Sequence, residues 1–266
     1  MSIAQQVYRD LENVRSKAPL VHNITNYVVM NNTANALLAA GASPVMAHAP
    51  EEVKEMTAIA SALVVNIGTL SREWITGMKY AMSEAKEQGI PVVLDPVGVG
   101  ATAYRNNTAD ELLSDYHPDI VRGNASEILA LAKKAGETKG VDALHDSSDA
   151  LEAGKKLAKQ FNCAVVISGA TDYVIDENKS FQIEDGHPLM SRVTGMGCTA
   201  SALTGAFAAI NNNYVEASRH AMVTMGISGE LAAEKSDGPG SMQLQFLDAL
   251  YQLNLKQLKN QLEKSE

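Results

Sequence analysis

The sequence predicts an α/β fold in which helices cover both faces of a mostly parallel central sheet. Short β-branched apolar runs alternate with longer stretches of helical periodicity along most of the chain. The runs A-L-V-V-N-I at Ala62–Ile67 and P-V-V-L-D at Pro91–Asp95 are apolar at nearly every position, as strands buried on both faces are. No repeat, low-complexity segment or linker rich in Pro, Ser or Gly interrupts this order, so we expect a single domain over residues 1–266.

The expected strands and helices alternate until about Ser168. Strands are expected at Leu20–Ile24, Pro44–Met46, Leu63–Ile67, Val92–Leu94, Ile120–Arg122 and Val165–Ser168. Helices are expected at Asn31–Ala40, Ser71–Gln88, Ser126–Ala135 and Ser148–Phe161, and residues 1–10 also look helical. Ser71 is a favoured N-cap residue and Gly89 a favoured helix terminator, so the second of these helices has clear ends.

The pattern changes after Ser168. Tyr173–Asp176 and Lys179–Ile183, separated by two residues, predict a β-hairpin. Asp185–Pro188 breaks the chain, and from Gly197 onward the sequence is almost wholly helical. We therefore expect the alternation of strands and helices to give way to a hairpin and then to helices.

The composition excludes some classes of function. The net charge is −9, the isoelectric point is about 5.2 and no basic stripe is present, so nucleic-acid binding is not expected. No run approaches the ~20 apolar residues that cross a bilayer, and residues 1–10 lack the features of a signal peptide. The two cysteines, Cys163 and Cys198, have no disulfide-framework or zinc-site spacing. We expect a cytoplasmic protein without membrane or nucleic-acid partners.

A glycine-rich turn opens the helical region. In Val193–Cys198, V-T-G-M-G-C, two glycines stand two residues apart before a predicted helix of small residues, Cys198–Ile210. Such a turn at a helix N-terminus offers free N–H groups and the positive end of the helix dipole to a phosphate or an oxyanion. The glycines could equally serve only a tight turn. The motif is not a P-loop, because no G-K-[ST] follows.

Cys198 is placed in the first turn of that helix. A thiol at a helix N-terminus is expected to have a pKa below the free value of about 8.5. It could then deprotonate a substrate hydroxyl or hydrogen-bond to it. The alternative is a small residue that only packs beneath the sheet, as we expect for Cys163 at the start of an apolar run.

Polar residues stand at the ends of four predicted strands. Asn66, Asp95, Arg122 and Ser168 are each followed closely by glycine. Ligands of open α/β sheets bind beyond the carboxyl ends of the strands, so the repetition favours one shared site over four unrelated turns.

Two carboxylates near these ends are candidate magnesium ligands. Asp95 and Glu127 could hold Mg²⁺ through water, because Mg²⁺ keeps much of its hydration shell. Glu127 could instead cap a helix. Arg122 could contact nucleotide phosphates or pair with a surface acid.

A second glycine pattern competes with this interpretation. Gly98–Ala103 matches G-x-G-x-x-A, a dinucleotide-binding fingerprint. The acidic residue that should end the next strand is missing, because Asp119 starts that strand instead. The stretch T-A-Y-R-N-N from Thr102 is also a poor helix opening, so we interpret the match as coincidental.

Taken in order, these motifs resemble the ribokinase-like superfamily. They are D-P-V-G-V-G-A-T from Asp95, R-G-N-A-S-E from Arg122 and V-T-G-M-G-C from Val193. N-x-x-E at Asn124–Glu127 resembles the magnesium and phosphate motif of that superfamily. G-x-G-[D/C] at Gly195–Cys198 resembles its anion hole and catalytic position.

Further motifs narrow the resemblance to one family. Most superfamily members carry Asp at the position of Cys198. A Cys there, together with V-H-N-I-T-N at Val21–Asn26 and the asparagines of Asn32–Ala36, is similar to the hydroxyethylthiazole kinases. The resemblance runs from about Leu20 to Leu250.

This resemblance implies a ribokinase-like three-layer α/β/α sandwich and a defined reaction. The reaction is ATP-dependent phosphorylation of the hydroxyl of 4-methyl-5-(2-hydroxyethyl)thiazole, in thiamin salvage and biosynthesis. The resemblance also implies a homotrimer with sites at subunit interfaces. The site residues it implies are Cys198, Gly195 and Gly197 for catalysis; Met46, Gly195 and Asn26 for the thiazole; Arg122, Ser168 and Thr194 for ATP; and Asp95 and Glu127 for Mg²⁺.

Two other functions remain as alternatives. Hydroxymethylpyrimidine kinases and ATP-dependent hydrate dehydratases resemble this pattern in fold and anion hole, but they usually keep Asp at the position of Cys198. A non-catalytic nucleotide-binding or regulatory protein is the second alternative. The pair Asp95 and Glu127 argues against it, since a pure binder needs no metal pair.

Overall fold

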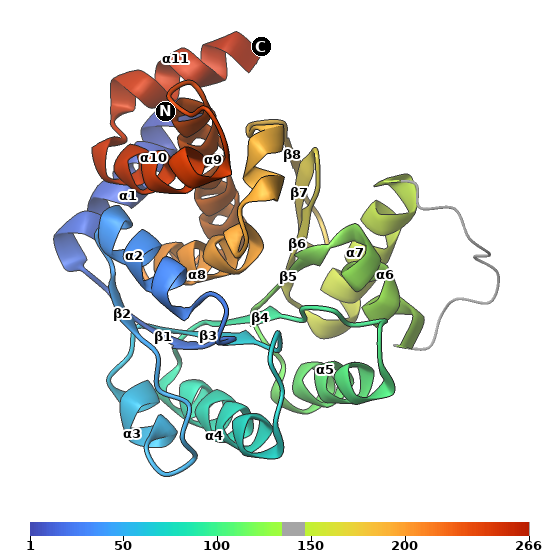
Figure 1. Ribbon diagram of the computed structural model, residues 1–266. Helices are drawn as coiled ribbons and strands as arrows, with labels where there is room; N and C mark the ends of the chain where they lie inside the picture. Colours follow the sequence, from blue (N-terminus) through green and yellow to red (C-terminus); the bar gives the residue numbers. More distant parts are fainter. Residues whose placement is uncertain (135–146, 266) are drawn as a thin grey trace.

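A computed structural model describes residues 1–134 and 147–265, and within them one eight-stranded sheet is found (Figure 1). The strand order is β2-β1-β3-β4-β5-β6-β7-β8, with β1 to β6 parallel and β7 and β8 added antiparallel. The strands are β1 (Leu20–Ile24), β2 (Ser43–Val45), β3 (Ala62–Asn66), β4 (Val92–Asp95), β5 (Ile120–Asn124), β6 (Ala164–Ser168), β7 (Asp172–Ile175) and β8 (Ser180–Ile183). The predicted α/β class with a mostly parallel sheet is confirmed.

Helices lie on both faces of this sheet. The first group is α1 (Ile3–Lys17), α2 (Met30–Ala40), α3 (Val53–Ala58), α4 (Arg72–Gln88), α5 (Ala103–Tyr116), α6 (Ala125–Lys134) and α7 (Ser147–Phe161). After the hairpin come the 3₁₀ helix η1 (Pro188–Arg192) and the helices α8 (Met196–Ala208), α9 (Tyr214–Ala233), α10 (Pro239–Gln252) and α11 (Leu255–Ser265). No helix in the described ranges is long and apolar enough to cross a membrane.

All six predicted strands, the hairpin and the four predicted helices are present within a residue or two of their expected bounds. Ala135, the last residue of one predicted helix, lies outside the described residues. Ser71 caps α4 by accepting a hydrogen bond from the N–H of Trp74, and Gly89 ends the helix with φ +67°. The short helices α3 and η1 were not predicted.

The prediction that Thr102 and the residues after it form a poor helix opening is wrong. Helix α5 begins at Ala103, and the Thr102 hydroxyl accepts a hydrogen bond from the N–H of Arg105 at its N-terminus. The side chain of Thr102 therefore supplies the cap, although the residues that follow have modest helix propensity.

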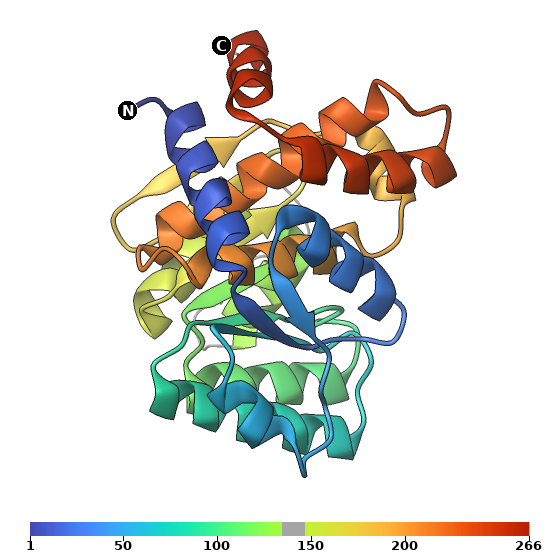
Figure 2. The same ribbon diagram turned by 90° about the vertical axis from the view of Figure 1, so that its left-hand side faces the viewer.

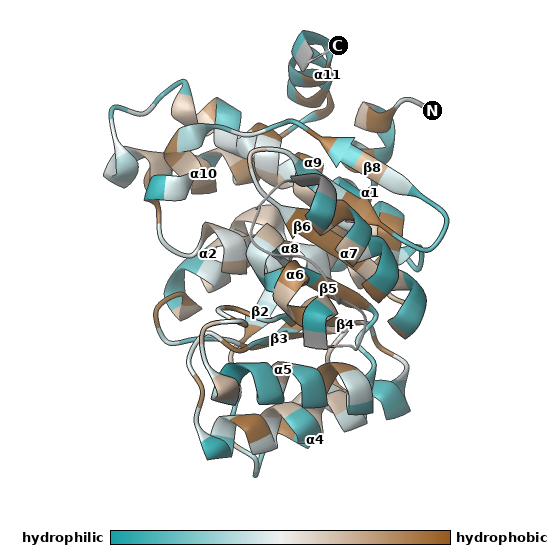
Figure 3. Cartoon of the chain, turned by 90° about the vertical axis from the view of Figure 1, so that its right-hand side faces the viewer, coloured by the Kyte–Doolittle hydropathy of each residue, from teal (hydrophilic) through white to brown (hydrophobic). Residues whose placement is uncertain are grey.

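Two apolar cores flank the sheet. One lies beneath α1, α2, α8, α9, α10 and α11, and the other beneath α3 to α7. Figure 2 shows the dark blue helices α1 and α2 with the orange and red helices on one side of the sheet, and the lighter blue α3 with the teal and green helices on the other. In Figure 3 the hydrophobic colour concentrates in the central strands, while outer helices such as α4 and α5 carry hydrophilic faces. The layering buries the parallel strands on both faces, which explains their continuous apolar runs.

Helix α8 approaches the sheet closely. A Cβ at Gly205 would lie 2.6 Å from Cγ2 of Val64 on β3, so only glycine fits there. Residues Thr199–Ala208 are all buried. A helix that is covered on every side is a central element rather than a surface one.

Strand alternation directs the polar strand ends toward α8. Successive side chains of a strand point to opposite faces, so residues two apart share a face. The side chains of Val64, Val93, Ile120 and Val166 belong to the core on the α8 side. Two residues further along the same strands come Asn66, Asp95, Arg122 and Ser168. All four therefore face the helix layer that contains α8.

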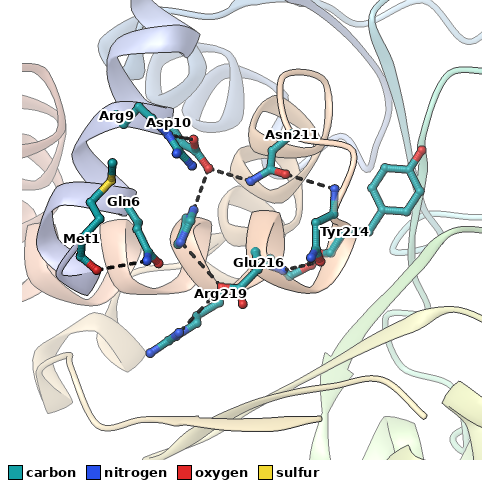
Figure 4. A network of polar contacts seen from close by, with 11 residues as sticks. Met1, Gln6, Arg9, Asp10, Asn211, Tyr214, Glu216 and Arg219 are labelled. Atoms are coloured by element: carbon teal, nitrogen blue, oxygen red, sulfur yellow. Dashed lines mark hydrogen bonds and ion pairs between the residues drawn. The ribbon is translucent and has the colours of Figure 1, made fainter. Parts of the chain in front are cut away.

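A buried polar network joins α1 to α9 (Figure 4). The carboxylate of Asp10 accepts hydrogen bonds from His220 Nδ1 at 2.6 Å and from Asn211 Nδ2 at 2.7 Å. Burial alone would raise the pKa of Asp10, but the hydrogen bonds from His220 and Asn211 outweigh burial and lower it. Arg219, on the same helix as His220, stacks over the ring of Phe181 on β8. The network thus ties the N-terminal helix to the second half of the chain.

We predict that Asp10→Ala lowers the free energy of unfolding by about 2–3 kcal/mol at pH 7, because it leaves the buried His220 and the half-buried Asn211 without their acceptor. Urea denaturation followed by circular dichroism measures this. Arg9→Ala is the control: its side chain is 54% exposed, so a change within about 0.5 kcal/mol is expected.

The difference between wild type and Asp10→Ala should also depend on pH. Because folding lowers the pKa of Asp10, its stabilisation is present above the unfolded pKa of about 3.9 and is lost as the pH falls below it. A difference that stays constant from pH 7 to pH 3 would contradict this account.

Candidate functional site

The polar strand ends lie in one row as two hydrogen-bonded pairs. Asn66 and Asp95 are register partners on β3 and β4, and Asn66 Nδ2 donates to Asp95 Oδ2 at 2.7 Å. Arg122 Nη2, on β5, donates to Ser168 Oγ, on β6, at 2.7 Å. The structure therefore brings the four strand ends together, and Asn26, just after β1, extends the first pair by donating to Asn66 Oδ1 at 3.0 Å.

The N-terminus of α8 lies over this row. Gly195 is its N-cap with φ +84°, a conformation in which a side chain would be strained, and a Cβ there would also lie 2.7 Å from Cγ1 of Val29. A Cβ on Gly197 would lie 2.8 Å from Nη1 of Arg122. Gly197 thus lets the guanidinium group approach the backbone at the start of the helix, while Gly195 makes room for Val29.

Cys198 stands in the first turn of α8, as predicted. Its sulfur accepts N–H groups from Asn66 Nδ2 at 3.2 Å and from Asn26 Nδ2 at 3.4 Å. The expectation of a lowered thiol pKa is wrong. Burial raises the pKa of Cys198 and the charge of Asp95 adds to this, against the smaller opposing effects of Asn66, Asn26 and Arg122. The thiol therefore keeps its proton near neutral pH.

Cys163 is a packed core thiol, as expected. It is buried at the start of β6, and burial raises its pKa to about 12. Only Cys198 of the two borders the site.

A cavity of about 670 Å³ opens in front of these groups. Five predicted site residues line it together with Gly195 and Gly197: Asp95, Arg122, Glu127, Ser168 and Cys198. Its other walls come from the loop after β6, the loop before η1 and the α9 residues Met222, Met225 and Gly226. A volume in the range of ordinary small-molecule sites, with a few convergent polar groups, fits a ligand-binding cavity.

The cavity carries charges of both signs. Arg122 and the N-terminus of α8 line it, and so do Asp172 and Asp185 from the two ends of the hairpin. Burial raises the pKa of both carboxyl groups, that of Asp185 to about 6, where the nearby Glu230 adds to the effect. The cavity can therefore receive an anion at α8 and hydrogen-bond donors at the two carboxyl groups.

Glu127 binds two backbone segments. Its Oε1 accepts the N–H of Gly98 and its Oε2 the N–H of Asn124, both at 2.8 Å, while Asn124 Oδ1 accepts the N–H of Glu127 at 2.9 Å. The reciprocal pair is a capping box at the start of α6, the alternative role considered for Glu127. The N–H of Gly100 likewise bonds Asn106 Oδ1. Because these N–H groups are committed, the G-x-G-x-x-A turn does not offer them to a dinucleotide.

Asp95 suits a hydrated cation. Its Oδ2 accepts hydrogen bonds from Asn66 and Ser201, but its buried Oδ1 has no hydrogen-bond partner in the described chain. Burial raises the pKa of Asp95 to about 6, against the smaller opposing effects of the Arg122 charge and of the hydrogen bonds from Ser201 and Asn66. No group of three or more His, Cys, Asp or Glu that could cage a metal occurs in the described ranges. Mg²⁺ needs no such cage, because one or two carboxylates, water and substrate phosphates suffice.

Three predicted residues lie outside the lining of the cavity. Asn26 is buried behind Cys198 and touches the site through it. Thr194 is exposed and borders a separate small hollow beside α10. Met46 follows the edge strand β2, half-buried, away from the cavity.

Several residues in or beside the cavity were missed from sequence. Ser201 follows Cys198 by one helical turn and donates from Oγ to Asp95 Oδ2 at 2.7 Å. Nothing distinguishes it within a run of small helix residues. Asp172 and Asp185 flank the hairpin and gave no signal either, because only the folded chain brings both hairpin ends to the cavity.

A family model described as "Hydroxyethylthiazole kinase family" matches residues 11–256. A protein of Syntrophus aciditrophicus described as hydroxyethylthiazole kinase is 60% identical over 241 residues, which cover 90% of this chain and 89% of that protein. A solved structure of a hydroxyethylthiazole kinase protein from Pyrococcus horikoshii has 45% identity and a TM-score of 0.90, and the match covers 96% of each chain. The resemblance stated from the sequence motifs is confirmed at the level of the family.

The wider fold also agrees. A ribokinase-like superfamily protein of Enterococcus faecalis has a TM-score of 0.62 at 14% identity, covering 94% of both chains. At that identity the match concerns the fold alone, and it confirms the ribokinase-like three-layer architecture.

We predict that Gly197→Ala weakens ATP binding at least about tenfold, or 1.4 kcal/mol. The new Cβ would push the buried Arg122 guanidinium away from Ser168 and from the start of α8. Isothermal titration calorimetry measures the affinity. Gly240→Ala, on α10, is the matched control, because nothing lies within 4 Å of a Cβ there. Equal ATP affinity of the two variants would contradict the role given to this close approach.

Proposed function

The chain belongs to the hydroxyethylthiazole kinase family, and from that premise we propose that it transfers the terminal phosphoryl group of ATP to the hydroxyl of 4-methyl-5-(2-hydroxyethyl)thiazole in this cavity. The observation that carries the proposal is the convergence, in one cavity, of Arg122, the free N–H groups of α8 and the buried carboxylate of Asp95. A phosphoryl donor needs a cation and N–H donors for its oxygens, and those groups stand together here.

We infer that ATP lies with its phosphates toward α8 and its nucleoside toward the hairpin. The N–H groups of Gly197 and Cys198, the guanidinium of Arg122 and the hydroxyl of Ser168 can all donate to phosphate oxygens. Asp172 and Asp185, which line the cavity from the hairpin, would repel phosphates but accept hydrogen bonds from ribose or base. Thr194 is exposed beside the turn, so a contact from it to ATP requires the turn to move.

The transfer is carried mainly by positioning and charge stabilisation. Phosphoryl transfer passes through a loose transition state, so the acceptor hydroxyl needs little activation. The helix N-terminus and Arg122 stabilise charge on the transferred group. Because its pKa is raised, Cys198 acts as a neutral hydrogen-bonding partner that orients the hydroxyl, and not as a thiolate base. The hydroxyl proton can therefore leave late, to an oxygen of the transferred phosphoryl group, after the bond from the hydroxyl oxygen to phosphorus has begun to form and the bond to ADP has begun to break.

We propose Asp95 and Glu127 as the residues that hold Mg²⁺ through water. When bound, the ion supplies positive charge that neutralises the phosphate oxygens. The unpartnered Oδ1 of Asp95 supports its part. Glu127 also keeps the Gly98 turn at the cavity edge through its hydrogen bond.

For the thiazole we propose contacts with Asn26, Gly195 and Met46, and a homotrimer whose sites lie at subunit interfaces. Met46 lies by the sheet edge at β2, and Tyr27 and Val28, in the loop after β1, the strand next to β2, are 62% and 67% exposed. A second copy at this edge would cover these side chains and bring Met46 against a neighbouring site. A solution mass of one chain by light scattering would contradict the trimer.

We further infer one catalytic domain over residues 1–266 and a cytoplasmic location. One sheet supplies the whole row of strand ends, and the two cysteines are free thiols, which persist in a reducing compartment. Recovery of the protein in an extracytoplasmic fraction would contradict the location.

We predict that the purified protein releases ADP from Mg-ATP with hydroxyethylthiazole and not with hydroxymethylpyrimidine or ribose. We expect this specificity for two reasons. The chain matches the hydroxyethylthiazole kinase family over most of its length, and it has Cys198 where hydroxymethylpyrimidine kinases usually carry Asp. A coupled ADP assay with phosphorylated product identified by mass spectrometry measures this. Turnover with another alcohol would overturn the substrate but keep the phosphate site. Nucleotide binding that is independent of Mg²⁺, with no ADP release on any alcohol, would favour a binding protein.

A further inference from the structure

We propose that Asn66 is a positioning residue for the phosphoryl transfer. Its side-chain NH₂ group donates hydrogen bonds to both the Cys198 thiol and the Asp95 carboxylate. It thereby fixes the position of the thiol, which orients the acceptor hydroxyl, relative to the carboxylate, which lies at the phosphates. This inference rests on the proposed function, because it concerns the same site. It assigns a role to Asn66, which does not contact the reacting atoms.

The backbone places Asn66 between these two partners. It is the last residue of β3, with β1 on one side and β4 on the other, and its register partner on β4 is Asp95. Its side chain shares the face of Val64, toward α8, where Cys198 occupies the first turn. Asn66 is 1% exposed, so it reaches the cavity only through its neighbours.

Every hydrogen-bonding capacity of the Asn66 amide is used. The NH₂ group donates to Asp95 Oδ2 at 2.7 Å and to Cys198 Sγ at 3.2 Å. The oxygen accepts from Asn26 Nδ2 at 3.0 Å and from the N–H of Gly68 at 2.9 Å. A flipped amide would set oxygen against the Asp95 carboxylate and NH₂ against the Gly68 N–H. The chemistry of the four partners therefore permits a single orientation.

The sulfur of Cys198 is held from one side by two amides. Asn66 and Asn26 both donate to it, so the S–H group is left to point away from them. Asn26 is itself held tightly, because a Cβ on Gly68 would lie 2.6 Å from its Nδ2. The sulfur is thus fixed by the same amide that binds the Asp95 carboxylate.

Loss of the bridge should affect turnover more than binding. The phosphate donors Arg122 and the α8 N–H groups do not contact Asn66 by hydrogen bonds. A shift of the thiol of about 1 Å can cost about 100-fold in rate, because the acceptor hydroxyl leaves its reactive alignment. The expected result is a fall in kcat with KM for ATP and for the thiazole nearly unchanged.

Asn66→Leu is the selective test, since it removes the amide without adding a charge. Asn66→Asp keeps the oxygen that accepts from Asn26 and Gly68 but sets a carboxylate against Asp95 in place of the NH₂ group. We expect both to lower kcat about 100-fold, and Asn66→Leu to change KM less than about threefold. The matched control is Asn23→Leu on β1, where an equally buried asparagine donates to Val21 O. That variant should lose stability while the folded protein keeps its kcat.

A double-mutant cycle with Cys198→Ala separates positioning from general loss of structure. If Asn66 acts partly through the thiol, the combined variant should be little worse than the more damaged single variant. Two results would overturn the proposal. One is a loss of kcat in the double variant equal to the product of the two single-variant losses, and the other is an equal kcat for Asn66→Leu and Asn23→Leu. Should Asn66→Asp fail to fold, the cycle with Asn66→Leu decides the matter. A wild type that does not phosphorylate the thiazole would instead overturn the proposed function.

Discussion

The close approach of α8 to the sheet is the constraint on which the site depends. Gly205 lets the helix lie against Val64, and this contact sets the height of the helix N-terminus above the strand ends. Strand alternation then turns the last polar side chains of four neighbouring strands toward that N-terminus. Gly197 completes the arrangement by admitting Arg122 beside the first turn. A larger residue at either glycine would move the N-terminus of α8 away from Arg122 and Asp95.

Burial explains the chemistry of the site. Asp95 and Cys198 are withdrawn from water, so both carry raised pKa values and both need hydrogen-bond donors. Asn66 supplies a donor to each, and Ser201 a second one to Asp95. Oδ1 of Asp95 has no hydrogen-bond partner among the residues that the structure describes, which favours the binding of a hydrated cation there. A thiol that keeps its proton is compatible with phosphoryl transfer, because a loose transition state asks little of a base.

The sequence was informative wherever the signal was local or periodic. Apolar runs located the strands, Ser71 and Gly89 marked the ends of α4, and the strand-end rule gathered Asp95, Arg122 and Ser168. Properties that arise from packing were missed. The thiol pKa was predicted with the wrong sign, because the helix N-terminus was counted while burial and the charge of Asp95 were not. The hydrogen bonds of Asn66 to Asp95 and Cys198, and the position of Asp172 and Asp185 in the cavity wall, depend on neighbours distant in sequence.

The most direct test of the central claim is a crystal structure with Mg²⁺, a non-hydrolysable ATP analogue and the thiazole. The account predicts the terminal phosphate within hydrogen-bond distance of the N–H groups at Gly197 and Cys198 and of Arg122, with the nucleoside toward Asp172 and Asp185. The thiazole hydroxyl should lie beside the Cys198 sulfur. A triphosphate bound in the reverse direction, or one bound away from α8, would contradict it.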